Sequence, residues 1–245
     1  MPVLNSLVLD HFYIALSNEQ VEKLTPLFND LGGSYQSTQS GKDSWSGLYL
    51  HSRLRDYFEV LEQRRLGCLG IALSAVNVTS VDSSKIMTEQ PSLPWKKGRR
   101  VIEDNQPWFD WYSLVEYENT YSTFFNVWIM DYHKCHFDYA KRPTPKFVDS
   151  FHKLVVVAEM NLRSNMIEAL QFTDFIIEQS AEKIVLSVPR KDHWPMTFEI
   201  HFSQDVIQVK PLKLFFSKFG VDSEVLKKYS FISIHQDQIE LNLDI

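Results

Sequence analysis

One order of segments recurs along this chain and limits the folds open to it: a strand, a helix and then three further strands. Residues 7–16 (LVLDHFYIAL) are apolar and aromatic and precede a polar break, which is typical of a strand. Residues 18–31 repeat apolar side chains at helical spacing and are followed by Gly32 and Gly33, so a helix is predicted there. The three strands predicted next cover residues 34–41, 45–51 and 56–63.

The same order returns further along the chain. Residues 69–76 (LGIALSAV) open the second block as a strand, and residues 77–88 form a weaker predicted helix. The loop and the two strands predicted after it cover residues 91–98, 108–118 and 123–132. The tetrapeptide IALS occurs at Ile14–Ser17 and again at Ile71–Ser74, at the same place in both blocks, which indicates an internal duplication.

A third block follows residues 141–146 (KRPTPK), which are predicted to be a linker because they hold two prolines and three basic residues. Its strand, helix and three strands are predicted at 151–158, 161–172, 175–179, 184–188 and 197–202. A further strand, a short helix and a closing hairpin are predicted at 206–216, 223–228 and 231–243.

The predicted fold class is therefore α+β, with repeated βαβββ modules that form curled mixed sheets and carry helices on the outer face. Residues 1–140 are expected to form a paired βαβββ domain. Residues 147–245 are expected to add a βαβββ-like module with a C-terminal hairpin.

Composition argues against several classes of partner. The 245 residues carry a net charge of −6, and an acidic chain repels phosphate backbones, so no nucleic-acid binding is expected. The densest basic run, Lys96–Arg100, is interpreted as a solvated loop. The N-terminus has no signal-peptide pattern, and no apolar run reaches the roughly 18 residues of a membrane span. We expect a cytoplasmic protein without membrane contact, for which a homodimer is an open possibility.

His11 and Glu59 are the polar residues that most invite a functional interpretation. Strand alternation places His11 on one face with Leu9 and Tyr13, and it places Glu59 on one face with Tyr57 and Leu61. A carboxylate within so apolar a strand needs a partner or a raised pKa. The alternatives are a core histidine bonded to a backbone carbonyl and an acid on an edge strand that faces water.

The segments around these residues resemble the vicinal oxygen chelate superfamily, which includes glyoxalase I, extradiol dioxygenases and bleomycin-resistance proteins. DHFYIAL (10–16) resembles its opening strand, YFEVLE (57–62) its closing strand, and GIALSAVNV (70–78) its second opening strand. The resemblance covers residues 5–132, and 151–216 more weakly. It implies sheets that curl around a cavity, with metal ligands on the first and last strand of each module.

Carried over to this chain, the resemblance implies a divalent metal (Zn, Fe, Mn or Ni) held by His11 and Glu59, with Asp131 as the acid of the second module. Asn126 is the other polar candidate on that last strand. The chain departs from the family where a histidine is expected after glycine, because Gly70 is followed by Ile71. A catalytic metal usually has about three protein ligands, so this set is incomplete.

Aromatic residues gather on the two strands predicted at 108–118 and 123–132. They could line an apolar cavity for a flat organic ligand, or they could be ordinary core. Tyr13, Tyr57, Trp111 and Trp128 are the predicted ligand-binding residues. In the third block, TFEIHF (197–202) resembles YFEVLE, which makes Glu199 and His201 a secondary site candidate beside His152.

Two functions follow from these patterns. The first is a divergent glyoxalase-like protein that binds a small organic ligand in an aromatic-lined cavity, with or without catalysis. The alternative is a divalent-metal-dependent lyase or dioxygenase that uses His11 and Glu59, with Glu59 as its catalytic carboxylate. No Gly-rich phosphate loop, GxSxG or CxxC motif supports another chemistry.

Overall fold

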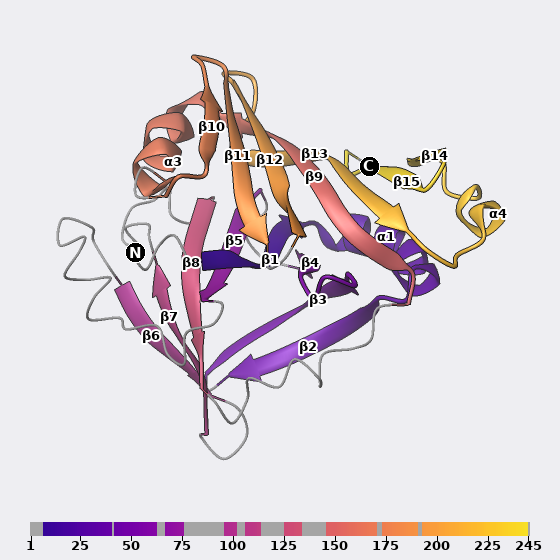
Figure 1. Cartoon of the computed structure of the whole chain (residues 1–245), viewed down its shortest axis with the longest axis horizontal. Helices are drawn as coiled ribbons and strands as arrows, with labels where there is room; N and C mark the ends of the chain where they lie inside the picture. Colours follow the sequence, from indigo (N-terminus) through magenta and orange to yellow (C-terminus); the bar gives the residue numbers. More distant parts are fainter. Residues whose placement is uncertain are drawn as a thin grey trace.

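The protein is seen here as a computed structural model, which describes residues 7–40, 42–62, 67–75, 96–101, 106–113, 125–133, 146–170, 173–190 and 193–244. Two curled mixed sheets with few helices make up the described part (Figure 1). None of the described helices is long and apolar enough to span a membrane. The helix predicted at 77–88 lies outside the described residues, as does most of the linker predicted at 141–146.

The first sheet is a symmetrical pair of modules, with strand order β2-β3-β4-β1-β5-β8-β7-β6. Within each half the first and last strands are parallel neighbours, β1 with β4 and β5 with β8. The halves join where β1 pairs antiparallel with β5. The strands are β1 (Leu7–Leu16), β2 (Ser34–Ser40), β3 (Asp43–His51), β4 (Tyr57–Glu62), β5 (Leu69–Ala75), β6 (Lys96–Val101), β7 (Pro107–Ser113) and β8 (Phe125–Tyr132). This order confirms that the strand arrangement of the first module recurs in the second.

Helix α1 (Asn18–Asp30) forms where the sequence predicts a helix, and its start is capped twice. The Ser17 side chain accepts the Gln20 N–H, and the Gln20 side chain in return accepts the Ser17 N–H. The helix runs through Pro26. Gly32 follows it with φ of 78°, a backbone conformation that glycine adopts without strain.

The second sheet repeats the arrangement in shortened form, with order β10-β11-β12-β9-β13-β15-β14. Strands β9 and β12 are parallel neighbours, and β13 pairs antiparallel with β9, as β5 does with β1. In a complete module the first strand pairs in parallel with the fourth. The neighbour of β13 is instead the antiparallel strand β15, so the last unit lacks a fourth strand. The elements are β9 (Val148–Glu159), η5 (Met160–Leu162), α3 (Arg163–Leu170), β10 (Ile176–Gln179), β11 (Lys183–Arg190), β12 (His193–Ser203), β13 (Val209–Lys218), α4 (Ser223–Leu226), β14 (Ile232–His235) and β15 (Gln238–Asn242).

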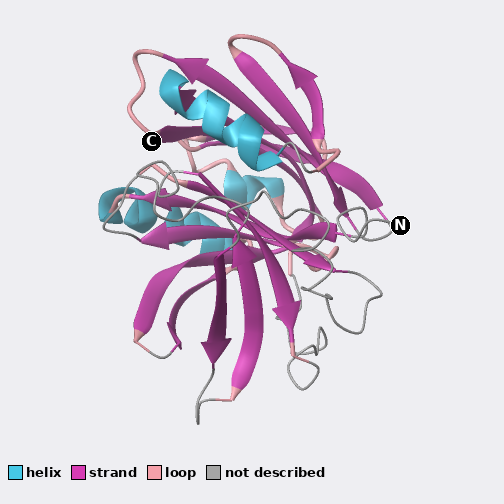
Figure 2. Cartoon of the chain, turned by 90° about the vertical axis from the view of Figure 1, so that its left-hand side faces the viewer, coloured by secondary structure: helices cyan, strands magenta, loops and turns pink. Residues whose placement is uncertain are grey.

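The two sheets pack against one another (Figures 1 and 2), and one apolar core includes residues of both. Phe12 of β1 stacks on Phe58 of β4 at 5.0 Å and meets Phe151 and Phe198 of the second sheet edge-on at 5.4 and 5.6 Å between ring centroids. The apolar residues of α1 join the same core. Each sheet therefore has an inner face in the core and an open face on the other side. The division into domains 1–140 and 147–245 stays a prediction.

The basic run Lys96–Arg100 is not a loop, as the sequence suggested, but part of edge strand β6. Its register places Gly98 opposite Trp111, and a Cβ at Gly98 would lie 2.3 Å from the Trp111 indole. Edge strands tolerate charged side chains because only one edge is paired. This strand has no apolar alternation, which is why its sequence did not reveal it.

Candidate functional site

A bulge in β1 turns His11 to the open face of the first sheet. The pairing of β1 with β5 shifts between Leu9 and His11, with Asp10 as the extra residue. Leu9 consequently packs in the inner core with Phe12. The expectation that Leu9 shares a face with His11 was therefore wrong, since alternation does not hold across a bulge.

The same bulge brings the Asp10 carboxylate against the His11 ring. Asp10 Oδ1 lies 2.8 Å from His11 Nδ1 and also accepts the Tyr132 hydroxyl at 3.3 Å. Asp10 and His11 are both buried. A carboxylate at Nδ1 favours a proton on that nitrogen, which leaves Nε2 as the acceptor for a ligand. Sequence analysis missed Asp10, although an aspartate within an apolar strand was a visible signal.

Aromatic rings surround His11 on this face. The Tyr57 ring stacks on the His11 ring with centroids 4.4 Å apart, and Trp128 meets His11 edge-on at 5.4 Å. Tyr13 lies 5.5 Å from Trp128, and Trp111 packs in the same cluster as Trp128. The structure thus brings the four predicted ligand-binding aromatic residues to one face of the sheet.

Glu59 projects to the same face and is almost fully buried, with 4% of its surface exposed. It lies beside Tyr13 in the β1–β4 register, while its neighbours Phe58 and Val60 enter the inner core as alternation predicts. Burial raises the pKa of Glu59, and the His11 charge and the hydrogen bonds of Tyr49 and Trp45 lower it in part.

One oxygen of Glu59 has no donor. Tyr49 and Trp45 bond to the carboxylate, and Trp45 Nε1 also donates to the Tyr49 hydroxyl at 3.1 Å. Glu59 Oε1 is buried and without a hydrogen-bond partner. A buried acceptor left unsatisfied costs about 1–3 kcal/mol. A ligand that donates a hydrogen bond to this atom would therefore remove that cost.

The second half of the face has no room for the histidine that the family resemblance implies. Gly70 lies on the open face, and Ile71 is buried in the inner core. A Cβ at Gly70 would lie 2.0 Å from Tyr13 Cε1. The Tyr13 ring therefore occupies the space that a side chain at position 70 would need.

Asp131 does not join His11 and Glu59. Met130 and Tyr132 on either side of it pack in the aromatic cluster of the open face, so Asp131 points to the opposite face of β8. In the pairing of β7 with β8 it lies beside Asp110. Within the described part of the chain, no three His, Cys, Asp or Glu side chains come close enough to hold a metal ion.

The second sheet holds a register equivalent of the site. Glu199 lies beside Val155 in the β9–β12 pair as Glu59 lies beside Tyr13, which places Lys153 at the position of His11. Lys153 Nζ lies 3.4 Å from Glu199 Oε2, and His201 Nε2 lies 2.7 Å from Glu199 Oε1. Burial alone would raise the pKa of Glu199, but these two partners lower it. The predicted pair of Glu199 and His201 thus exists as an ion-pair network.

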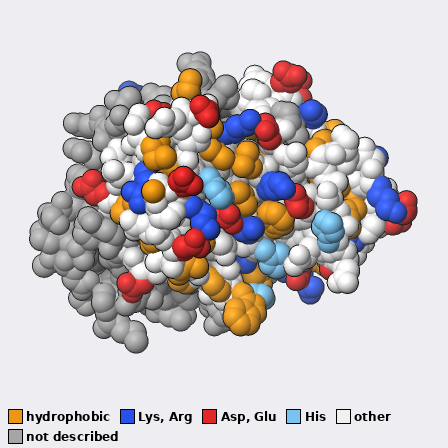
Figure 3. Space-filling model, turned by 90° about the horizontal axis from the view of Figure 1, so that it is seen from above, with side chains coloured by type: hydrophobic (Ala, Val, Ile, Leu, Met, Phe, Trp, Pro, Cys, Tyr) orange, Lys and Arg blue, Asp and Glu red, His pale blue; other side chains and the backbone are white. Residues whose placement is uncertain are grey.

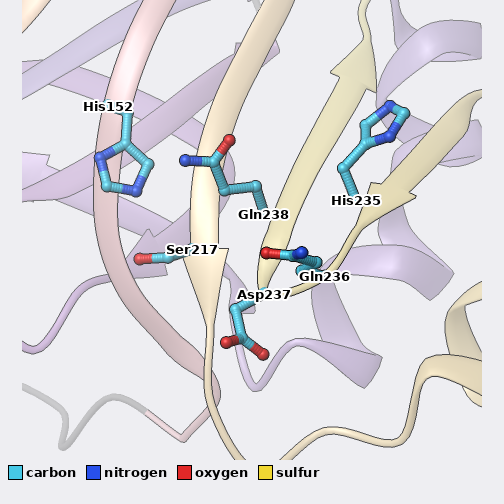
Figure 4. A pocket seen from close by; sticks show the side chains of 6 residues that line it. All are labelled: His152, Ser217, His235, Gln236, Asp237 and Gln238. Carbon is cyan, nitrogen blue, oxygen red and sulfur yellow. The ribbon is translucent and has the colours of Figure 1, made fainter.

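This side of the molecule also holds a pocket of about 820 Å³, between the ends of β9 and β13 and the β14–β15 turn (Figure 4). Polar side chains line it, with the rings of His152 and His235 on opposite sides of Gln238. Burial lowers the pKa of His152, and so does the positive charge of Arg190. Seen from above, charged and histidine side chains are interspersed among apolar ones (Figure 3). The pocket lining has no aromatic ring beyond its two histidines, unlike the face around His11.

Comparison with known proteins supports the architecture. No family model and no curated protein matches this chain. A hypothetical protein from Staphylococcus aureus matches at 10% identity and a TM-score of 0.51, over 83% of this chain and 88% of its own.

Two further solved structures match at lower similarity. A xylose isomerase-like TIM barrel/4-hydroxyphenylpyruvate dioxygenase fusion protein has 6% identity and a TM-score of 0.42, over 81% of this chain and 32% of its own. The halotolerant catechol dioxygenase BphC has 9% identity and a TM-score of 0.41, over 91% and 74%. At such identities the likeness concerns the fold alone. The chain therefore shares its overall fold with the Staphylococcus aureus protein.

Proposed function

We propose that this protein binds a small organic ligand on the open face of the first sheet, with His11 and Glu59 as the polar contacts. The observation that carries the proposal is Glu59 Oε1, a buried acceptor without a donor among aromatic rings. A ligand that donates a hydrogen bond there offsets the cost of burying the carboxylate. His11 Nε2, oriented by Asp10, accepts a second one.

The aromatic side chains supply the rest of the binding energy. Tyr57 and Trp128 contact His11 directly, and Tyr13 contacts Trp128. Flat rings bury a large area with few rotatable bonds, so they bind planar ligands at low entropic cost. We propose Tyr13, Tyr57, Trp111 and Trp128 as the residues that contact the apolar part of the ligand.

The residues that the structure describes at this face do not fit a catalytic divalent metal. His11 Nε2 and Glu59 Oε1 could supply two metal-ligand atoms, whereas the protein usually supplies about three ligand atoms to a catalytic metal. Gly70 has no side chain, and Asp131 faces the other way. Binding without metal chemistry is therefore the better supported function, and we propose that Glu59 acts as a hydrogen-bond acceptor rather than as the predicted catalytic carboxylate.

Ligand titration tests the proposal. Trp fluorescence of the full chain is measured while small aromatic compounds with hydrogen-bond donors are added, and we expect saturable quenching. Glu59→Gln removes the charge from the acceptor, and a hydrogen bond to a charged group contributes about 1.5–3 kcal/mol. Affinity should therefore fall about 10- to 100-fold. Glu199→Gln, at the equivalent position of the second sheet, is the matched control and should bind like the wild type.

The alternative, a divalent-metal lyase or dioxygenase, rests on His11 and Glu59 sharing one face. Metal analysis of the purified protein separates it from the binding function. Stoichiometric Zn, Fe, Mn or Ni that disappears in both His11→Ala and Glu59→Ala would favour the enzyme. If neither metal nor saturable ligand binding is observed, both functions are excluded for this face.

A further inference from the structure

The two sheets place a carboxylate at the same register position but neutralise it differently. On the second sheet the ammonium of Lys153 lies against Glu199 at 3.4 Å and over the Phe215 ring, 4.8 Å from its centroid. The protein thus contains an ammonium ion held between a carboxylate and an aromatic face. An ammonium group therefore fits beside a glutamate at this register position.

On the first sheet the position of Lys153 is taken by His11, and no ammonium is supplied. The donors to Glu59 are the neutral Tyr49 and Trp45. No lysine or arginine among the described residues forms an ion pair with Glu59. The second carboxylate, Asp10, is already bonded to His11 and Tyr132. Apart from the His11 ring, whose charge lowers the pKa of Glu59, no cationic side chain of the described residues compensates this carboxylate.

The rings near Glu59 favour the same kind of group. Tyr57 has ring centroids at 6.0 Å to Tyr49 and 4.4 Å to His11, and Tyr13 lies beside Glu59 in register. Faces of tyrosine and tryptophan rings attract cations. A neutral ligand would stack on these rings and could donate a hydrogen bond to Glu59, but it would leave the carboxylate charge uncompensated.

We infer that the ligand of the first sheet is an organic ammonium ion, a primary or secondary amine attached to a flat apolar group. Its N–H groups donate to Glu59 Oε1, and its apolar group lies against Tyr57 and Trp128. The ligand ammonium takes the place that Lys153 Nζ has on the second sheet. The inference rests on the proposed binding function and specifies its ligand class.

A matched pair of probes tests this class. Benzylamine, protonated at pH 7, and the neutral benzyl alcohol are titrated into the full chain by calorimetry. We expect the wild type to bind the amine at least about tenfold more tightly, since an added charge-assisted hydrogen bond contributes about 1.5–3 kcal/mol. Glu59→Gln should abolish that preference, and Glu199→Gln should retain it.

His11→Lys gives a second, independent variant. It places an ammonium at the register position that Lys153 occupies on the second sheet, so it should pair with Glu59 and prevent amine binding in a folded protein. Equal affinity of the wild type for both probes would overturn the inference and leave the binding function intact. Amine binding unchanged in a folded His11→Lys protein would also overturn it. If neither probe nor other aromatic compounds bind, the proposed function fails as well.

Discussion

Tyr13 and Gly70 face one another across the β1–β5 pairing and decide what the first sheet can bind. The Tyr13 ring lies directly over the Gly70 backbone, at a distance that leaves no space for a Cβ. Glycine is therefore required at position 70 as long as tyrosine stands at position 13. A side chain at position 70 and the Tyr13 ring therefore exclude one another.

This contact predicts a pair of variants. Gly70→His alone should destabilise the protein by about 1–3 kcal/mol, the usual cost of overpacking, because the new side chain collides with Tyr13. Tyr13→Ala combined with Gly70→His should recover most of that loss. Urea unfolding of the two single variants and the double variant measures the coupling. Additive effects would show that Tyr13 does not occupy the space at position 70.

At the level of elements, β1–β4 and β9–β12 are two versions of the same strand pair. Both place a glutamate on the open face at the same register, and both have a register irregularity in their first strand. The glutamate lies beside Tyr13 in the first sheet and beside Val155 in the second. The residue two positions before this neighbour, His11 or Lys153, sets the charge near the glutamate. One element geometry thus yields the proposed binding face in one sheet and an ion pair in the other.

The equivalence predicts that Lys153→His creates a metal site on the second sheet. The new imidazole would join Glu199 and His201, whose side chains already lie 2.7 Å apart. Three such ligands suit Zn²⁺ or Ni²⁺. We expect stoichiometric binding by calorimetry in Lys153→His, and its loss when His201→Ala is added. A Lys153→Gln control should bind no metal.

Across the whole molecule, a buried ion pair joins the two sheets beside their shared aromatic core. Arg190 Nε at the end of β11 lies 2.7 Å from Asp56 Oδ2 just before β4, and both side chains are 2–3% exposed. Ser52 also bonds to the Asp56 carboxylate. The attraction between the two charges offsets the cost of removing each from water. The pair therefore fixes how the sheets meet.

Replacing one partner of the Arg190–Asp56 pair should lower the stability of the protein more than replacing both. Arg190→Met leaves the Asp56 charge buried and unpaired, which typically costs about 3–5 kcal/mol. Arg190→Met combined with Asp56→Leu should recover part of this loss, because no charge remains to be buried. Thermal unfolding of the three proteins checks the order. A double variant less stable than Arg190→Met would contradict the assignment.

The sequence by itself determined the order of most described elements, with β6 as an exception, and the direction in which the side chains of β4 point. Apolar spacing and the Ser17 cap specify α1, and strict alternation in YFEVLE sends Phe58 and Val60 inward and Glu59 outward. Trp128 and Asp131 were both predicted for the site, although residues three apart in a regular strand face opposite sides. These features depend on local geometry, so they can be derived from local sequence.

Tertiary structure decided the chemistry of the site. The bulge that turns Asp10 toward His11 exists only in the pairing of β1 with β5. The contact that fills the space at Gly70 joins residues 57 positions apart, and the donors to Glu59 come from the neighbouring strand β3. Such contacts arise from how strands pair and curl, which no single segment encodes. The unsatisfied oxygen of Glu59, on which the function rests, is therefore a property of the folded sheet.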